Sequence, residues 1–146
     1  THKSINNGIK KTTWPCRLEK GELKNIPVYL DGAHNLDGFK KVVSFFKNKK
    51  IERWAILGML NNKDLKGCLL KLKNIVNGVI AIEIPGETNS FKVTEIKDLC
   101  SNINIKCVMK KNITQSNNYL IKTIKPKEII ILGSLYLVGK IRNLYI

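Results

Sequence analysis

The chain has 146 residues, of which 43% are hydrophobic and 25% charged, a size and composition typical of one folded domain and unlike a disordered protein. No apolar run approaches the roughly 18 residues that a membrane-spanning helix requires, and no signal-peptide hydrophobic region opens the chain. We therefore expect a cytoplasmic protein without a membrane partner. A first residue of Thr1 is typical of a fragment or a processed product.

The formal net charge of +15 raises the question of a nucleic-acid partner. Only 3 of the 26 basic residues are arginine, and the lysines are scattered, with no stripe of interleaved aromatic residues. We therefore predict no nucleic-acid binding and favour a groove for an anionic ligand. Because lysine is used so freely, we expect arginine to occur at positions that need a planar guanidinium with two parallel N–H donors. These positions are Arg17, Arg53 and Arg142.

Cysteine spacing argues against a zinc site or a redox motif, because no C-x-x-C pair occurs. Cys68 and Cys100 fall on apolar helical stripes, where cysteine acts as a small hydrophobic residue. We expect all four cysteines to be reduced structural thiols, and we expect no metal ligands in this chain.

Residues 1–13 carry isolated isoleucines among polar residues and are expected to be a helix end that enters a loop. Pro15 restricts Trp14, and the alternation of residues 17–19 after this anchor predicts a short edge strand. A polar turn is predicted over residues 20–27.

From residue 28 onward, short apolar runs alternate with apolar stripes of helical period. Strands are predicted at residues 28–30, 54–57, 79–82, 105–109 and 128–132. Helices are predicted at residues 36–47, after an Asp64 cap, after a Ser90 cap, at 113–124 and after residues 133–134. Strands that alternate with helices form right-handed β-α-β units, so the sequence predicts one α/β domain with a mainly parallel sheet.

Three turns follow predicted strands, at residues 31–35, 58–64 and 133–134. The carboxyl ends of parallel strands share one edge of a sheet, where ligands bind, so we expect the turns to converge there. Asp31 could accept hydrogen bonds from ribose hydroxyls or only cap its turn, and His34 could contact phosphate or only bond within the loop.

Helix capping competes with ligand binding at the second turn. Lys63 and Asp64 could reach a phosphate or its Mg²⁺, whereas capping the next helix is the simpler role for Asp64. The chain has no G-x-x-x-x-G-K-S/T phosphate loop, no G-x-G-x-x-G and no G-x-S-x-G elbow. No complete catalytic site is therefore predicted within it.

Four sequence blocks occur in a fixed order: Trp-Pro-Cys-Arg-Leu-Glu at 14–19, Asp-Gly-Ala-His-Asn at 31–35, Gly-Met-Leu at 58–60, and Gly-Ser-Leu-Tyr-Leu-Val-Gly at 133–139. Over nearly its whole length, the chain resembles the C-terminal domain of bacterial folylpolyglutamate synthase/dihydrofolate synthase, in the Mur ligase superfamily. The second block is shared with the peptidoglycan Mur ligases, whereas the first and last blocks point to the folate branch. The resemblance implies a Rossmann-like, mostly parallel sheet of about six strands flanked by helices.

The resemblance also implies an ATP-dependent amide ligase. ATP would phosphorylate the carboxylate of folate or dihydropteroate, the amine of L-glutamate would attack the acyl phosphate, and Mg²⁺ would neutralise phosphate charge. Arg17 and Asp31 match ATP-binding positions, and His34 would be the catalytic residue near the transferred phosphate. Further phosphate or substrate contacts are expected from Asn35, Lys63, Asp64 and Ser134.

The chain departs from the family pattern at two positions and in length. Cys16 stands where glycine usually follows Trp-Pro, and a cysteine would be strained by roughly 1 kcal/mol if that position needs a positive φ. Leu36 replaces the usual proline, which should leave the helix start intact. The resemblance spans only the C-terminal domain, and the family's N-terminal domain carries the phosphate loop and the Mg²⁺ ligands.

We therefore expect residues 1–146 to form one monomeric Mur ligase C-terminal domain that needs an N-terminal ATP-binding domain, in cis or in trans, for ligase activity. Two alternatives stay open. The chain could be a peptidoglycan-branch ligase domain, or a non-catalytic remnant that binds nucleotide weakly.

Overall fold

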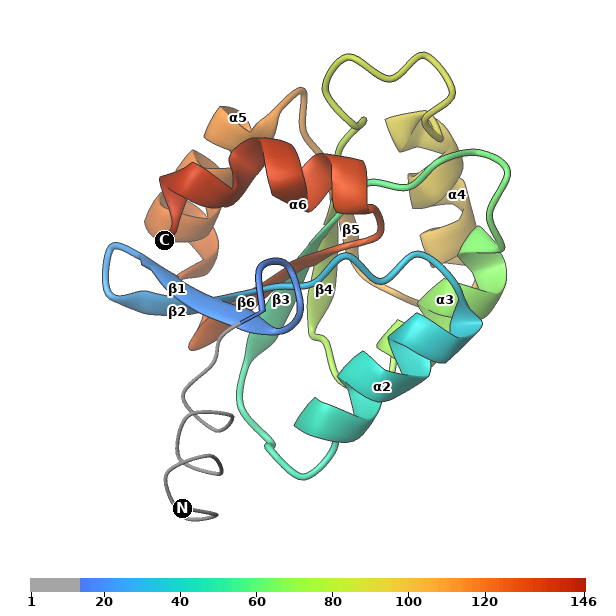
Figure 1. The fold of residues 1–146 in the computed structure, drawn as a ribbon. Coiled ribbons are helices and arrows are strands. Elements are labelled where there is room, and N and C mark those ends of the chain that lie inside the picture. The colour runs from blue at the N-terminus through green and yellow to red at the C-terminus, as the bar shows by residue number, and fades with distance from the viewer. Residues whose placement is uncertain (1–13) are drawn as a thin grey trace, which may run out of the picture.

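The computed structural model describes residues 14–146 as three layers, with a twisted sheet between two layers of helices (Figure 1). The helix end expected within residues 1–13 lies outside the described residues. The strands are β1 (Glu19–Leu23), β2 (Ile26–Leu30), β3 (Arg53–Leu57), β4 (Gly78–Ala81), β5 (Cys107–Met109) and β6 (Glu128–Leu132). The helices are α2 (Leu36–Phe46), α3 (Leu65–Leu72), α4 (Val93–Asn102), α5 (Ile113–Tyr119) and α6 (Leu135–Ile141), with a π-helical turn η1 (Leu120–Ile124) after α5 and a 3-10 turn η2 (Arg142–Leu144) after α6.

The sheet of the described chain has the strand order β1-β2-β6-β3-β4-β5. Only the β1–β2 pair is antiparallel, and the other four pairs are parallel. The α/β class, the mostly parallel sheet and the count of about six strands are thus confirmed. None of the helices in the described chain is long and apolar enough to cross a membrane.

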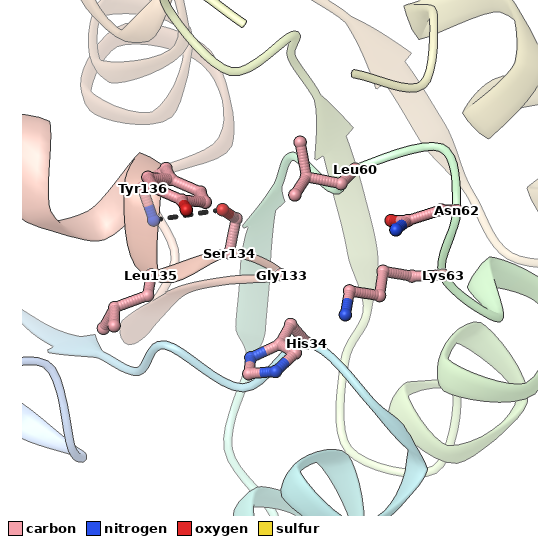
Figure 2. Close-up of a pocket in the computed structure, with 8 residues that line it drawn as sticks. All are labelled: His34, Leu60, Asn62, Lys63, Gly133, Ser134, Leu135 and Tyr136. Carbon is pink, nitrogen blue, oxygen red and sulfur yellow. Dashed lines mark hydrogen bonds between the residues drawn. The ribbon is translucent and has the colours of Figure 1, made fainter. Parts of the chain in front are cut away.

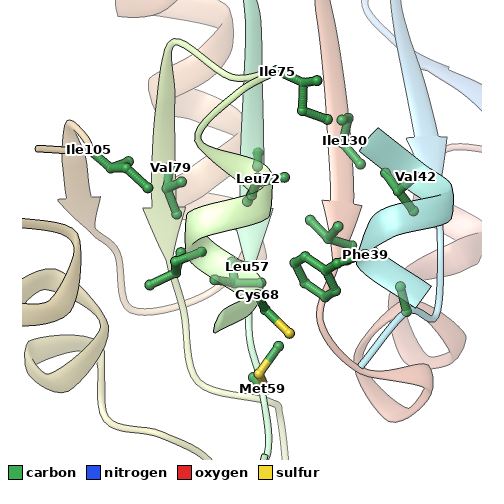
Figure 3. Packing of buried hydrophobic residues seen from close by; sticks show 14 of the residues in the cluster. Phe39, Val42, Leu57, Met59, Cys68, Leu72, Ile75, Val79, Ile105 and Ile130 are labelled. Atoms are coloured by element: carbon green, nitrogen blue, oxygen red, sulfur yellow. The ribbon is translucent and has the colours of Figure 1, made fainter. Parts of the chain in front are cut away.

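Side chains alternate between the two faces of the central strands and build two hydrophobic clusters. Ala55, Leu57 and Ile130 face one cluster, which α2, α3 and α4 cover (Figure 3). Ile56 and Ile131 face the other cluster, which η1 and α6 cover. Strands covered on both faces read as continuous apolar runs, which is why the sequence located β3, β4 and β6 closely.

The polar turn predicted over residues 20–27 is wrong. These residues form most of the β1–β2 hairpin, with Glu19 paired to Leu30 and the turn at Lys24 and Asn25, both at positive φ. A polar edge strand carries no apolar alternation, because its side chains face solvent. The pairing of β1 with β2 and the tertiary contacts at the ends of β1 hold this strand in place.

Smaller differences concern helix boundaries. Ser90 does not cap α4, which begins after Lys92 instead; Ser90 is buried, and its hydroxyl accepts a hydrogen bond from the Ile84 amide at 3.0 Å. The helix predicted at 113–124 is α5 followed by the π-helical turn η1, which ends in a left-handed Lys125.

Two of the three arginines make structural ion pairs that use the guanidinium fork. Arg53, at the start of β3, is 1% exposed and donates from Nε to Glu128 of β6 at 2.5 Å. Arg142 donates from Nε and Nη2 to the two carboxylate oxygens of Glu19, at 2.8 and 2.6 Å, and so fastens the end of α6 to β1. The expectation that arginine marks places needing a guanidinium is confirmed at these two positions.

Candidate functional site

The three turns predicted to share an edge of the sheet do so. They surround a hollow of about 370 Å³ at the carboxyl ends of β2, β3 and β6 (Figure 2). Its walls are His34, Leu60, Asn62, Lys63, Gly133, Ser134, Leu135 and Tyr136. The convergence follows from the strand order, because β6 lies between β2 and β3 in a parallel arrangement.

Gly133 allows the three turns to approach each other closely. It has a φ of 115°, which strongly disfavours other residues, and a Cβ there would collide with the carbonyl oxygen of Gly58. The Gly133 amide donates to the carbonyl oxygen of Ala33 at 2.9 Å. Backbone contacts therefore tie the turn after β6 to the turns after β2 and β3.

A second hollow of about 530 Å³ adjoins the first and shares His34 and Leu135 with it. Its walls also include Arg17, Asp31 and Lys41, so two cationic side chains and one carboxylate border the same space. The loop before β1 forms one side of this hollow, because the Gly32 amide donates to the Cys16 carbonyl oxygen at 2.8 Å.

Asp31 is half-buried beneath the second hollow. Its Oδ2 accepts a hydrogen bond from the Leu18 amide at 3.0 Å, and its Oδ1 accepts one from the Ala33 amide at 2.8 Å. Burial raises the pKa of this carboxyl, against the opposing effect of the two amides and of the Arg17 charge. The turn-capping role is thus present, and each oxygen keeps a lone pair for a ligand hydroxyl.

His34 stands exposed between the two hollows. Its Nδ1 lies 3.0 Å from the carbonyl oxygen of Gly32. A carbonyl can only accept, so Nδ1 carries the proton in this bond, and in neutral His34 Nε2 is left as the acceptor nitrogen. The Lys63 side chain extends toward the His34 ring from the facing loop (Figure 2).

Cys16 has a φ of 61°, in the left-handed region that favours glycine, which confirms the strain expected at this position. Its side chain is nevertheless buried in the cluster beneath β2, and its amide donates to Glu19 Oε1 at 3.1 Å. Packing and this hydrogen bond hold the strained loop that presents Arg17 to the second hollow.

Three of the predicted contact residues are helix caps. Asn35 accepts from the Gly38 amide at 2.9 Å, Asp64 accepts from the Gly67 amide at 2.9 Å, and Ser134 accepts from the Tyr136 amide at 3.1 Å. Ser134 also lines the first hollow, whereas Asn35 and Asp64 line neither hollow. The structure therefore brings together His34, Lys63 and Ser134 in the first hollow, and Arg17, Asp31 and His34 in the second.

Sequence reasoning missed Lys41, Asn62 and Tyr136, which also line the hollows. Tyr136 belongs to the Gly-Ser-Leu-Tyr block and is 58% exposed at the start of α6, so its position after a strand could have signalled it. Lys41 and Asn62 carry no such signal among the many lysines and asparagines of the chain. Within residues 14–146, no group of three or more His, Cys, Asp or Glu side chains could hold a metal ion.

The site can be compared with known proteins. The sequence profile of the "Dihydrofolate synthetase, C-terminal domain" family matches residues 15–144. The dihydrofolate synthase/folylpolyglutamate synthase of Bacillus subtilis is 28% identical over 151 residues, which cover 96% of this chain and 32% of that protein.

Solved structures show the same fold. The folylpolyglutamate synthase of Mycobacterium tuberculosis, complexed with ADP and AMPPCP, superposes with a TM-score of 0.85 at 19% identity, covering 99% of this chain and 35% of that one. The bifunctional folylpolyglutamate synthase/dihydrofolate synthase of Yersinia pestis, with Mn, AMPPNP and L-glutamate bound, gives a TM-score of 0.79 at 16% identity over 99% of this chain and 35% of that one. The chain thus spans about a third of the length of these relatives, and it belongs to the family of dihydrofolate synthetase C-terminal domains.

Proposed function

We propose that this chain is the C-terminal domain of an ATP-dependent amide ligase that adds L-glutamate to folate, and also to dihydropteroate, through an acyl phosphate. One observation carries the proposal: turns from three strand ends bring His34, Lys63 and Ser134 into one hollow beside the hollow of Arg17 and Asp31. Family membership supports it, as do the nucleotide and glutamate in the Mycobacterium and Yersinia structures.

The cationic side chains suit a polyphosphate. The exposed Arg17 guanidinium can bind two phosphate oxygens at once, and the Lys63 ammonium reaches from the facing loop. Asp31 can bind a nucleoside through its ribose, because two backbone amides fix the orientation of its carboxylate and leave lone pairs that can accept hydrogen bonds from the two ribose hydroxyls.

We assign proton transfer to His34. With Nδ1 held by the Gly32 carbonyl, Nε2 can accept a proton from the glutamate amine as that amine attacks the acyl carbon; the bond from that carbon to the phosphate oxygen then breaks, and inorganic phosphate leaves. Ser134 and Tyr136, at the start of α6, would contact the amino-acid substrate from the opposite wall.

ATP would supply the phosphoryl group, and Mg²⁺ would neutralise its charge. No cluster of the described residues could hold the metal, so we assign its ligands and the phosphate loop to an N-terminal domain. The two hollows of this chain then form one wall of a site that lies between two domains.

The test is to join this chain to the N-terminal domain of the Bacillus subtilis relative and to follow glutamate incorporation. We expect the fusion to elongate dihydropteroate or tetrahydrofolate in an ATP-dependent reaction, while the chain alone shows none. His34→Ala should lower kcat by about 10²–10⁴-fold, as expected for a lost proton-transfer group. Arg17→Ala should mainly raise the KM for ATP.

Lys40→Ala is the matched control, because Lys40 is an exposed α2 lysine that lines neither hollow and should leave both constants unchanged. Activity only with a UDP-linked muramoyl acceptor would move the chain to the peptidoglycan branch. A folded fusion without activity on any acceptor would indicate a remnant, and glutamate addition by the isolated chain would refute the dependence on a second domain.

A further inference from the structure

An exposed leucine separates the two hollows of the candidate site. Leu135 and His34 line both hollows and so form the wall that the hollows share. The Leu135 side chain is 59% exposed, although it is aliphatic. Its apolar surface therefore lies in the middle of a site whose other proposed contacts are charged or polar.

The start of α6 and a glycine on the facing turn set the position of this side chain. Leu135 is the first residue of α6, directly after the cap Ser134, whose hydroxyl accepts a hydrogen bond from the Tyr136 amide at 3.1 Å. The Leu135 side chain extends toward the turn after β2 (Figure 2) and lies against Gly32, where a Cβ would come within 2.6 Å of Leu135 Cδ1. The absence of a side chain at Gly32 thus leaves room for Leu135 between the hollows.

Under the proposed function, this shared wall is where the reacting groups meet. The second hollow would hold the nucleotide and the first would hold the incoming amino acid, so the acyl phosphate would lie beside Leu135 and His34. Water can attack the acyl carbon as the amine does, and inorganic phosphate leaves in both reactions. Attack by the amine forms the amide, whereas attack by water regenerates the carboxylate and releases a proton.

His34 does not distinguish between these two nucleophiles. Its Nε2 is the free acceptor nitrogen, because Nδ1 is bonded to the Gly32 carbonyl oxygen, and it could accept a proton from water as well as from an amine. A second group at the same wall must therefore disfavour water. An aliphatic side chain can do so, because it offers no hydrogen bond to a water molecule beside it.

We propose that Leu135 keeps water away from the acyl phosphate, so that the amine reacts and hydrolysis is suppressed. This inference rests on the proposed function and adds to it a residue that determines which nucleophile reacts. Exclusion of water is a general means by which enzymes prevent the hydrolysis of reactive intermediates. The exposed leucine would serve this purpose once a second domain covers the site.

The test uses the fusion with the Bacillus subtilis N-terminal domain and measures the phosphate released per glutamate incorporated. The wild-type fusion should release about one phosphate per glutamate. Leu135→Ala should raise this ratio at least about threefold, because water then reaches the acyl phosphate. Leu135→Met retains an apolar side chain of similar size and should keep the wild-type ratio.

Two conditions identify the source of the additional phosphate. It should require dihydropteroate, because no acyl phosphate forms without an acceptor. It should also decrease as the glutamate concentration rises, because the amine and water compete for the same acyl carbon. Additional phosphate that forms without dihydropteroate would come from direct hydrolysis of ATP and would contradict the proposal.

Leu70→Ala is the matched control, because Leu70 is a 45% exposed leucine of α3 that lines neither hollow, and it should leave the ratio unchanged. An active fusion in which Leu135→Ala keeps the wild-type ratio would overturn the role of Leu135 alone, as would a change confined to the KM for ATP. A wild-type fusion that forms no glutamate product would instead overturn the proposed function, and this inference with it.

Discussion

The buried ion pair between β3 and β6 gives the sharpest stability prediction. Arg53 donates to Glu128 Oε1 at 2.5 Å, to the Ile75 carbonyl oxygen at 2.8 Å and to the Lys49 carbonyl oxygen at 3.2 Å. Its guanidinium also lies 4.3 Å from the centre of the Phe46 ring. The side chains of Arg53 and Glu128 are only 1% and 5% exposed, so water cannot replace either partner.

Arg53→Met should lower the free energy of unfolding by about 3–5 kcal/mol, because it leaves the Glu128 carboxylate buried without its counter-charge. For a domain of this size, about 2–4 °C of melting temperature per kcal/mol gives a fall of roughly 6–20 °C. The double variant Arg53→Met/Glu128→Leu removes both charges and should be less destabilised than Arg53→Met alone, by at least about 2 kcal/mol.

Urea unfolding followed by circular dichroism measures these changes from the transition midpoint at constant m-value. Arg17→Met removes the same charge from an exposed position and should change the free energy of unfolding by no more than about 0.5 kcal/mol. Two results would refute the reasoning. One is a fall in the free energy of unfolding of less than about 1 kcal/mol for Arg53→Met, and the other is a fall for the double variant that equals the sum of the falls for the two single variants.

Three further predictions concern backbone strain and pH. Lys125→Gly should raise the melting temperature through a gain of about 0.5–1 kcal/mol, because Lys125 ends its helix exposed at a φ of 52°. Gly133→Ala should lower the free energy of unfolding, measured in urea, by more than about 2 kcal/mol, because a φ of 115° strains any residue with a Cβ and that Cβ would collide with the Gly58 carbonyl oxygen. The hydrogen bond from Arg142 holds the pKa of Glu19 below its ordinary value of 4.5. The ionised Glu19 carboxylate therefore stabilises the fold fully above pH 4.5, and this stabilisation is lost as the pH falls through the lowered pKa of the folded protein. Glu19→Gln should reduce the slope of stability against pH below about pH 5, measured by urea unfolding at stepped pH.

Much of the candidate site could be predicted from local sequence, because its residues follow apolar strands directly. Asp31 and His34 come immediately after β2, and Lys63 and Ser134 come after β3 and β6. What the sequence left open was which of these polar residues face a ligand space. Asn35 and Asp64 are equally suitable in type, but they cap α2 and α3 and line neither hollow, whereas Ser134 caps α6 and still lines the first hollow.

By itself the sequence determined the order and type of the buried elements, because strands covered on both faces and amphipathic helices leave regular apolar patterns. The tertiary structure alone decided the β1–β2 hairpin. Gly21 packs where a Cβ would meet the Tyr145 carbonyl oxygen at 2.5 Å, and the Glu22 amide donates to that same oxygen at 3.0 Å.

The position of β6 between β2 and β3 was likewise decided only in three dimensions, and with it the two hollows. Strand order depends on contacts between residues about 100 positions apart, such as Val28 with Ile129, which no local pattern encodes. The sequence therefore located each turn of the candidate site, and long-range strand pairing brought the three turns together.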